Sequence, residues 1–358
     1  MSTTPLTRVR SLVSGSAARR HRASSPFLLV LVAALVMTAC GQDDTTSSSA
    51  TPSSGASAPG FPVTIKHARG STTINSEPQR VVTIGWSDQD PVLALGVRPV
   101  GTTEWFNEQP GAIFPWARAA AGDAKPEIVS TAGAGGEISY EKVAAVQPDL
   151  ILALYEGLEQ NEYDLLSQIA PTVAHSPDYD PFGATWQDMT LTAGRALGRE
   201  QRAKDLITDV EARFATVRAE HPEWAEQTML VMATVSEGSY QVFSPQDPKA
   251  RFFADLGFET TPPWISGRVQ DNVATVSAEE FRLLDVDRLA WTSDPDTLNQ
   301  LRDDRIYNLL NVVRDGRVSY LDYTQPPFPG AAVTFNTVLS IPYALDLVVP
   351  ELEKSGPG

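Results

Sequence analysis

Short apolar runs rich in β-branched residues alternate with helical segments through most of this chain, and this alternation constrains the fold more than any other feature. The runs predicted as strands are 81–84, 97–102, 127–129, 150–154 and 172–174 in the first half, and 229–235, 240–243, 289–292 and 318–320 in the second. Strands separated by helices form βαβ units, whose parallel sheets are buried on both faces. The sequence therefore predicts an α/β fold.

The longest helical stretch lies between the two halves, at residues 185–197 and 200–220, and Gly198 divides it. A chain of 358 residues has room for two domains of ordinary size. We expect a first lobe at 61–184, a crossing helix at 185–198, a second lobe at 199–350 and a tail at 351–358. In the first lobe, Asp90 followed by Pro91 and Gly96 predicts the N-cap, first turn and end of a short helix.

One internal similarity supports the two lobes. Residues 139–149 and 277–287 both begin with Ser-x-Glu, both end with Asp ten positions after the serine, and both precede an apolar strand. Each serine can cap a helix, and Glu280 could complete a capping box with Ser277. Two readings remain open at this point, namely two independently capped helices or an ancestrally duplicated lobe.

The first 60 residues indicate export and anchoring. Five arginines precede the apolar stretch 27–37, which is too short to span a bilayer and has the order of an export signal. Residues 37–40, Met-Thr-Ala-Cys, resemble the lipobox of bacterial lipoproteins, so 1–39 would be the signal peptide and Cys40 the lipidated residue. An unmodified cysteine in an ordinary signal anchor is the alternative. Residues 40–60 read as a flexible tether because their Ser-, Thr- and Gly-rich composition cannot form a core.

Charge and cysteine content exclude several classes of protein. The net charge is −16, and it becomes more negative once the basic first 39 residues are removed. A nucleic-acid partner is excluded, because phosphates require a basic face. A single cysteine allows neither an internal disulfide nor a cysteine-based zinc site.

Several short motifs occur in a fixed order within residues 61–350. They are Pro78-Gln-Arg80-Val-Val, Leu95-Gly96-Val97-Arg98-Pro99-Val100-Gly101, Pro148-Asp-Leu-Ile151, the segment 205–221 and Gly316-Arg317-Val318. Behind a lipobox, this series resembles the iron-siderophore substrate-binding lipoproteins of ABC importers, a family of periplasmic binding proteins that also includes vitamin B12 and haem binders. The resemblance implies two α/β lobes joined by a single long helix, with a ligand cleft between them.

The resemblance also implies a function and partners. The protein would be a monomer on the extracytoplasmic face of the cell membrane that captures a ferric siderophore and delivers it to the permease of the importer. In the family, one first-turn Glu in each lobe docks on arginines of the permease, and the matching positions here are Glu141 and Glu279. No cofactor is expected, because iron enters only as the bound chelate.

Candidate ligand-binding residues follow from the rule that ligands of open α/β sheets bind beyond the carboxyl ends of the strands. Aromatic residues recur there and can form flat walls, with Trp105 the strongest candidate. Ferric siderophores are commonly anionic, so a guanidinium could clamp them, and Arg268 is favoured over Arg98, Arg118 and Arg251. The full set of candidates is Trp86, Trp105, Phe106, Tyr155, Tyr240, Trp264, Arg268 and Trp291.

The sequence leaves three alternatives to compare with a siderophore-binding protein. A haem importer protein is the runner-up, with Tyr155 or Tyr240 as axial ligand, since His67, His175 and His221 do not lie at predicted strand ends. An enzyme is disfavoured, because the chain has no Gly-x-Ser-x-Gly nucleophile elbow and no complete nucleotide-binding glycine loop. A purely structural lipoprotein would explain the anchor but not the aromatic residues at strand ends. No direct metal site is expected.

Overall fold

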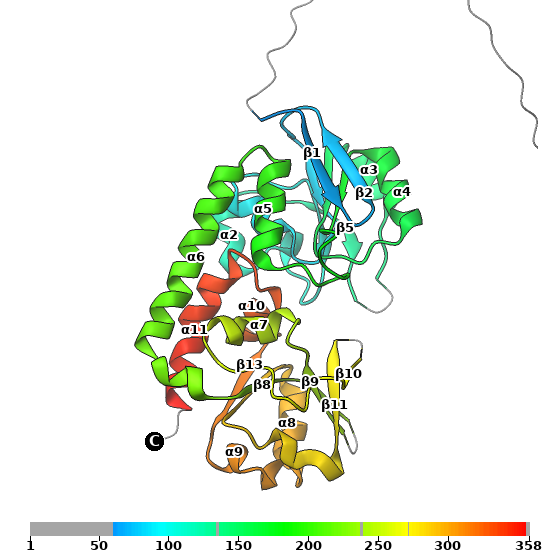
Figure 1. Cartoon of the computed structure of the whole chain (residues 1–358). Coiled ribbons are helices and arrows are strands. Elements are labelled where there is room, and N and C mark those ends of the chain that lie inside the picture. Colours follow the sequence, from blue (N-terminus) through cyan, green and yellow to red (C-terminus); the bar gives the residue numbers. More distant parts are fainter. Residues whose placement is uncertain (1–59, 134–135, 237–238, 271, 356–358) are drawn as a thin grey trace, which may run out of the picture. The chain divides into compact units, whose positions relative to one another are not determined.

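The computed structural model describes residues 60–133, 136–236, 239–270 and 272–355 (Figure 1). The predicted signal peptide, Cys40 and the tether up to residue 59 lie outside the described residues. Within the described part of the chain, no helix combines the length and apolar character needed to cross a membrane.

The first half folds around a five-stranded sheet in the order β5-β4-β3-β6-β7, with all neighbours parallel, as the alternating pattern predicts. An antiparallel hairpin, β1–β2, packs near β7 and was not expected from the sequence. The elements are β1 (Val63–His67), β2 (Gly70–Ile74), β3 (Val81–Thr83), α1 (Gln89–Ala94), β4 (Gly101–Glu104), η1 (Pro110–Ala112), η2 (Pro115–Ala117), α2 (Arg118–Ala121), β5 (Glu127–Thr131), α3 (Tyr140–Ala145), β6 (Leu150–Ala153), α4 (Gln160–Ile169), β7 (Thr172–Ala174), α5 (Trp186–Ala196) and α6 (Glu200–Glu220).

Both faces of this first sheet are buried, because successive side chains of a strand point to opposite faces. Leu150 and Leu152 of β6 pack with α1 and α5 on one face. Ile151 and Ala153 of the same strand pack with α3 and α4 on the other. The strands of this sheet are continuously apolar in sequence because helices cover both of its faces.

The second half contains a six-stranded sheet in the order β10-β11-β9-β8-β12-β13. Only β8, β12 and β13 are parallel neighbours; β9, β11 and β10 join antiparallel, so this sheet is mixed. The elements are η3 (Pro222–Glu226), β8 (Met229–Ser236), β9 (Ser239–Phe243), α7 (Pro248–Asp255), β10 (Val269–Gln270), β11 (Val273–Ser277), η4 (Ala278–Leu284), β12 (Arg288–Ser293), α8 (Pro295–Asp303), η5 (Tyr307–Leu309), α9 (Asn311–Arg314), β13 (Val318–Asp322), α10 (Pro329–Phe335) and α11 (Ser340–Lys354).

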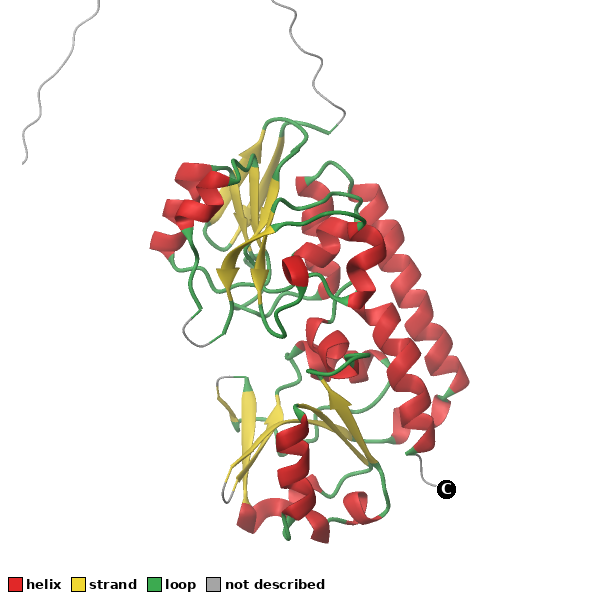
Figure 2. Cartoon of the chain, turned by 180° about the vertical axis from the view of Figure 1, so that it is seen from behind, coloured by secondary structure: helices red, strands yellow, loops and turns green. Residues whose placement is uncertain are grey.

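The long helix of the fold is α6, 21 residues, which follows α5 and leads into β8. Helix α5 packs along one part of α6, and α11 packs along another part of it (Figures 1 and 2). The segment 185–198, predicted as the crossing, instead holds the shorter α5, which packs against α1 and β1 of the first half. Gly198, with φ of 66°, ends that helix and lets the chain turn into α6. We therefore infer that α6 connects the two lobes.

Two local predictions in the first lobe are wrong in detail. The N-cap of α1 is Asp88 instead of Asp90, which lies inside the first turn. The strand predicted at 97–102 begins only at Gly101, because the Val97 amide donates to Val92 O (3.1 Å) and closes the end of α1. Gly96 ends this helix with φ of 79°, as predicted.

The internal similarity extends to hydrogen bonds. Asp149, before β6, accepts from the Gln79 and Arg80 amides (both 2.8 Å), which precede the parallel neighbour β3. Asp287, before β12, accepts from the Thr228 amide (2.8 Å), which precedes the parallel neighbour β8. Asp149 and Asp287, which occupy matching positions in the two similar segments, therefore each bind the backbone just before a parallel neighbouring strand. This shared contact favours a duplicated lobe over two unrelated capped helices.

Candidate ligand-binding site

The first sheet has a topological switch point between β3 and β6. From β3 the chain winds outward to β4 and β5, and then returns to add β6 and β7 on the other side. The carboxyl ends of β3 and β6 therefore face the crevice where α/β sheets bind ligands. Trp86 follows β3 and Tyr155 follows β6, and the Trp86 amide donates to Tyr155 O (3.1 Å). The structure brings these two predicted residues together at the expected place.

A buried carboxylate joins the loops at the switch point. The Asp88 carboxylate accepts from the Leu154 amide (2.6 Å) and the Tyr155 amide (3.0 Å). Burial raises the pKa of Asp88 to about 6, although the backbone hydrogen bonds oppose this shift. Gly85 is required beside it, because a Cβ at that position would lie 2.2 Å from the carboxylate. Asp88 thereby positions Trp86 and Tyr155.

Five aromatic side chains form a contiguous cluster at this edge of the sheet, which we call the aromatic edge. Ring centroids are 5.3 Å apart for Trp86–Trp105 and 5.1 Å for Trp105–Phe106, and Phe182 lies 4.6 Å from Trp86 and 5.7 Å from Tyr155. All but Tyr155 remain partly exposed. Phe182 was missed by the sequence reasoning because it lies in a loop between β7 and α5, where no strand-end rule applies. The aromatic edge consists of Trp86, Trp105, Phe106, Tyr155 and Phe182.

Residues of the second half complete the surroundings of the aromatic edge. Phe335 of α10 lies 5.1 Å from Trp105, and Tyr323, which follows β13, lies 5.5 Å from Phe106. The Asn107 side-chain amide donates to Tyr323 O (2.5 Å). Both halves of the chain therefore contribute aromatic rings to the same region. The sequence could not predict this proximity, because the residues are more than 200 positions apart.

Two glutamates flank the aromatic edge. Glu104 ends β4, immediately before Trp105, and its Oε1 accepts from the Glu108 amide (3.1 Å). Glu156 directly follows Tyr155, and its Oε1 accepts from the Gly157 amide (2.9 Å). Burial raises the pKa of each glutamate to about 7. A hydrogen bond from the Trp86 side chain to the Glu156 carboxylate opposes the rise in the pKa of Glu156.

Two predicted aromatics of the second lobe, Trp291 and Tyr240, are buried in its core, whereas Trp264 is partly exposed at the margin of the same cluster. Trp291 is completely buried, and its indole N–H donates to the Tyr307 hydroxyl (3.0 Å). It lies within β12, which runs on to Ser293, so its side chain points into the sheet's packed face and not beyond the strand end. Tyr240 is 2% exposed and donates to Asp304 (2.7 Å). Neither side chain reaches the surface, contrary to the expectation that they line a cleft.

The favoured arginine is already paired. Both terminal nitrogens of Arg268 bind the Glu280 carboxylate, at 2.9 and 3.1 Å, and Arg268 lies 5.9 Å over the Trp264 ring. The guanidinium of Arg268 is therefore already engaged by Glu280 of η4. The same Glu280 accepts from the Ser277 hydroxyl (3.3 Å), while the Ser277 side chain does not cap η4.

Arg251 lies beside the aromatic edge. It reaches from α7 to donate to Gly183 O (2.8 Å) and Ala184 O (3.3 Å), next to Phe182 in sequence, and its charge acts on the Tyr155 hydroxyl. Arg98 pairs with Asp123 at the surface (2.6 Å), and Arg118 donates to Gln109 (3.3 Å). Geometry thus ranks Arg251, a weaker candidate from sequence, above Arg268.

The residues considered for haem are poorly suited to ligate iron. Burial raises the pKa of Tyr155, and burial together with Asp304 raises that of Tyr240, so neither phenol is prepared to ionise. His67 and His175 are buried, and His221 stacks on Trp224 (4.1 Å). Among the described residues, no group of three or more His, Cys, Asp or Glu is placed to hold a metal ion.

The two predicted docking residues are exposed, one in each half. Glu141 lies in the first turn of α3, whose Ser139 N-cap accepts from the Lys142 amide (3.4 Å). Glu279 lies in the first turn of the 3₁₀ helix η4. A cavity of about 470 Å³ is lined by Glu141 together with Thr131, Glu137, Ile138, Ser139 and Tyr140.

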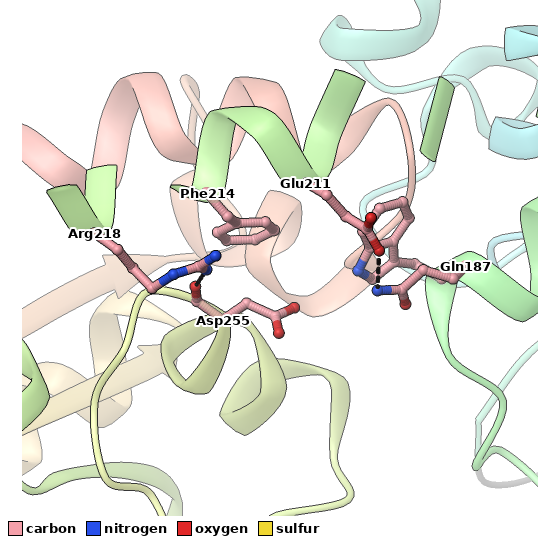
Figure 3. A pocket seen from close by; sticks show the side chains of 6 residues that line it. Gln187, Glu211, Phe214, Arg218 and Asp255 are labelled. Atoms are coloured by element: carbon pink, nitrogen blue, oxygen red, sulfur yellow. Dashed lines mark hydrogen bonds between the residues drawn. The ribbon is translucent and has the colours of Figure 1, made fainter. Parts of the chain in front are cut away.

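A second cavity, of about 240 Å³, lies among α5, α6 and α7 (Figure 3). In it Gln187 donates to Glu211 (3.5 Å), and Arg218 donates to the carbonyl oxygen of Asp255. Phe214 forms part of its wall. Neither of the two cavities is lined by the aromatic edge, so the candidate site rests on the position of the rings at the switch point and not on a closed pocket.

Comparisons with known proteins agree with this architecture. The family model described as periplasmic binding protein matches residues 81–324. A crystal structure of a periplasmic solute binding protein from Mycobacterium smegmatis is 32% identical, with a TM-score of 0.72, over 82% of this chain and 98% of that chain. PiaA from Streptococcus pneumoniae in complex with ferrichrome is 27% identical, with a TM-score of 0.69, over 82% and 98%. The Bacillus subtilis protein named "Probable siderophore-binding lipoprotein YfiY" is 25% identical over 273 residues, which are 72% of this chain and 80% of that protein.

Proposed function

Because the chain belongs to the periplasmic binding protein family, we propose that it is the substrate-binding component of an ABC importer, and that it captures a ferric siderophore and delivers it to the membrane permease. The observation that carries this proposal is the aromatic edge at the switch point of the first sheet. There, partly exposed Trp86 and Trp105 offer flat surfaces to a bulky chelate. Similarity to PiaA, an iron-uptake substrate-binding protein solved in complex with ferrichrome, and to YfiY, a probable siderophore-binding lipoprotein, supports the ligand class.

Ligand titration tests this proposal. The protein from residue 41 onward is titrated with a panel of ferric siderophores and with haem while tryptophan fluorescence is recorded, since Trp86 and Trp105 report on the proposed site. We expect saturable quenching by at least one ferric siderophore. Saturable quenching by haem alone would favour the haem importer, and no response to any member of the panel would refute ligand capture.

We further propose that Glu141 and Glu279 dock on the permease. Each is exposed in the first turn of a helix that lies within one of the two similar segments, 139–149 and 277–287. Exposed first-turn carboxylates contribute only about 0.3–1 kcal/mol to a helix. The double variant Glu141→Ala with Glu279→Ala should abolish iron uptake and leave ligand affinity nearly unchanged. Glu127→Ala with Glu226→Ala, two other exposed glutamates, is the matched control. Normal uptake by the first double variant would remove the docking role and leave helix capping as the function of the motif.

Localisation forms a separate proposal, because Cys40 lies outside the described residues. We propose that Cys40 carries a lipid and that residues 41–59 tether the folded part to the extracytoplasmic face of the membrane. More than one acyl chain is needed for stable anchoring, and the tether alone has no membrane affinity. Cys40→Ala should therefore release an exported protein into the soluble fraction, whereas membrane retention of this variant would contradict the lipid anchor.

A further inference from the structure

One ring of the aromatic edge is carried by a strained turn. In residues 180–183, the Gly183 amide donates to Asp180 O (2.8 Å). Phe182 lies inside this turn with φ of 59°, in the left-handed region that bulky side chains rarely adopt. A residue keeps such a conformation only where the surrounding structure enforces it. The contacts around Phe182 must therefore hold it in place.

The first lobe holds the ring of Phe182. Its centroid lies 4.6 Å from that of Trp86 and 5.7 Å from that of Tyr155. The ring also lies against the backbone of the loop after β6, because a Cβ added at Gly157 would be 3.0 Å from Cε2 of Phe182. These contacts act on the ring, and other groups hold the backbone that follows it.

The backbone after Phe182 is held from the second half of the chain. Arg251 of α7 donates to Gly183 O (2.8 Å) and Ala184 O (3.3 Å), which are the next two carbonyl groups. A guanidinium suits this role, because its planar donors can bind two acceptors at once. The following residue, Thr185, is already the N-cap of α5. Arg251 therefore fixes the short piece of chain between the strained turn and the start of α5.

Arg251 is itself fixed and has no acidic partner. Its neighbours Phe252 and Phe253 are fully buried in the core that α7 shares with α10. Among the described residues, Arg251 forms no ion pair, so its hydrogen bonds go to the backbone of the turn. Burial and the charge of Asp247 raise the pKa of Tyr155, and the charge of Arg251 opposes this rise. Arg251 thus lies beside Tyr155 as well as beside the turn.

We infer that Arg251 is a positioning residue for ligand capture, which acts from the second lobe on the turn that presents Phe182 to the ligand. The inference rests on the proposed function and adds a contact between the lobes to its site. Arg251 acts through the ring of Phe182 and does not touch the ligand. The aromatic edge therefore depends on both lobes, because the first supplies the rings and α7 of the second keeps one of them in place.

A direct clamp on an anionic ligand is the competing role, since the guanidinium of Arg251 has further N–H donors beyond those in its two contacts. The two roles differ in their response to ligand charge. A clamp favours anions, whereas a positioned ring serves neutral and anionic chelates alike. Ferrichrome, a neutral ferric trihydroxamate, and ferric enterobactin, an anionic ferric tricatecholate, are therefore the two probes.

The first measurement needs no ligand. Hydrogen–deuterium exchange is followed by mass spectrometry on the protein from residue 41 onward, in the wild type and in Arg251→Met. We expect the peptide that covers residues 180–185 to exchange at least about tenfold faster in the variant, because the turn loses its two hydrogen bonds to α7. If Arg251→Met does not fold, Arg251→Lys gives the same comparison with a smaller effect.

The matched control is Arg317→Met. Arg317 also donates to two successive backbone carbonyls, Val286 O (3.0 Å) and Asp287 O, but it does so at the amino ends of β12 and β13. These ends are opposite to the carboxyl ends at which ligands of α/β sheets bind. Arg317→Met should therefore leave the exchange of residues 180–185 and the affinity for both probes as in the wild type.

Affinities then test the role in capture. Arg251→Met should weaken the binding of ferrichrome and of ferric enterobactin by the same factor, about fivefold, and Phe182→Ala by about tenfold. The double variant should bind about as weakly as Phe182→Ala alone, because both changes remove the same contact. Arg251→Lys, which keeps the charge but has no planar fork, should recover only part of the loss. Melting temperatures confirm that each variant is folded.

Three results would overturn the inference. Unchanged exchange of residues 180–185 in Arg251→Met shows that other contacts hold the turn. A loss confined to ferric enterobactin, or losses that add up in the double variant, show that Arg251 binds the ligand directly. Wild-type affinity in Arg251→Met shows that the turn has no part in capture. All three leave siderophore capture intact, whereas no binding of any ferric siderophore by the wild type refutes the proposed function, and the exchange result then decides whether Arg251 holds the turn.

Discussion

The carboxyl ends of the two sheets carry similar residues with opposite environments. In the first lobe, Trp86 and Trp105 follow β3 and β4 and remain partly exposed at the switch point. In the second lobe, Trp291 lies inside β12 and is fully buried. Trp105 lies one residue beyond the end of β4, and Trp291 lies two residues before the end of β12. A shift of three residues relative to the strand end therefore separates a partly exposed tryptophan from a buried one.

One buried aspartate in each lobe also differs in its hydrogen-bond partners. Asp90 of the first lobe is 1% exposed and accepts from the Trp116 indole (2.7 Å) and the Thr337 hydroxyl (2.5 Å), with no cation beside it. Asp247 of the second half is 3% exposed and pairs with Lys249 (3.0 Å). The Asp247 carboxylate therefore has a cation within hydrogen-bonding distance, whereas the hydrogen bonds to the Asp90 carboxylate come from neutral donors.

The largest expected effect concerns the buried tryptophan. Trp291→Ala should lower the free energy of unfolding by about 3–5 kcal/mol, because it leaves a cavity in the second lobe's core and removes the hydrogen bond to Tyr307. Urea unfolding measures this loss. Trp264→Ala, a partly buried residue at the edge of the same cluster, is the control and should cost clearly less. A loss below about 1 kcal/mol for Trp291→Ala would contradict its assignment to the core.

The exposed tryptophan should act on affinity. Trp105→Ala is expected to weaken ferric siderophore binding by about 1–3 kcal/mol, since it removes the central ring of the aromatic edge. Isothermal titration measures the change, and Trp105→Phe, which keeps a ring, should retain most of the affinity. If Trp105→Ala binds like the wild type while Trp264→Ala does not, the ligand lies against the second lobe instead.

The unpaired acid predicts a dependence of stability on pH. Burial raises the pKa of folded Asp90 from 3.8 to about 7, so the folded state holds a proton that the unfolded state has released. The free energy of unfolding should therefore fall as pH rises between about 4 and 7, by at most about 1.4 kcal/mol per pH unit for this group. Asp90→Asn should flatten this slope in urea unfolding at several pH values. An unchanged slope would show that Asp90 is ionised in the folded protein.

The smallest effect is expected for the paired arginine. Arg268→Ala should change ligand affinity less than about twofold, because its fork is occupied by Glu280 at the surface. The sequence alone predicted that Arg268→Ala would weaken siderophore binding, because it treated the Arg268 guanidinium as a direct ligand contact. Arg251→Met is the informative comparison, since it removes the contacts to Gly183 and Ala184 beside the aromatic edge. A larger loss for Arg268→Ala than for Arg251→Met would reverse the ranking of the two arginines.

Most of the secondary structure could be predicted from the sequence, because apolar runs and capping residues act locally. The strands at β3, β6, β7, β8 and β13 lie where the β-branched runs predict them, and Ser139 caps α3 as its Ser-x-Glu pattern indicates. The α/β class and two lobes follow from the same patterns, and the family match confirms them. The hairpin β1–β2, the strands β10 and β11 and the antiparallel pairing of β9 were missed, because pairing partners lie outside any local window.

The sequence by itself determined that the chain is acidic, that tryptophans and tyrosines recur near the ends of predicted strands, and that residues 37–40 resemble a lipobox. Only the tertiary structure decided which of these rings share a surface, because that depends on strand order and on where each strand stops. It placed Phe182 beside Trp86, buried Trp291 and Tyr240, and paired Arg268 with Glu280. Such contacts join residues far apart in sequence, and their geometry arises from packing, which no local pattern encodes.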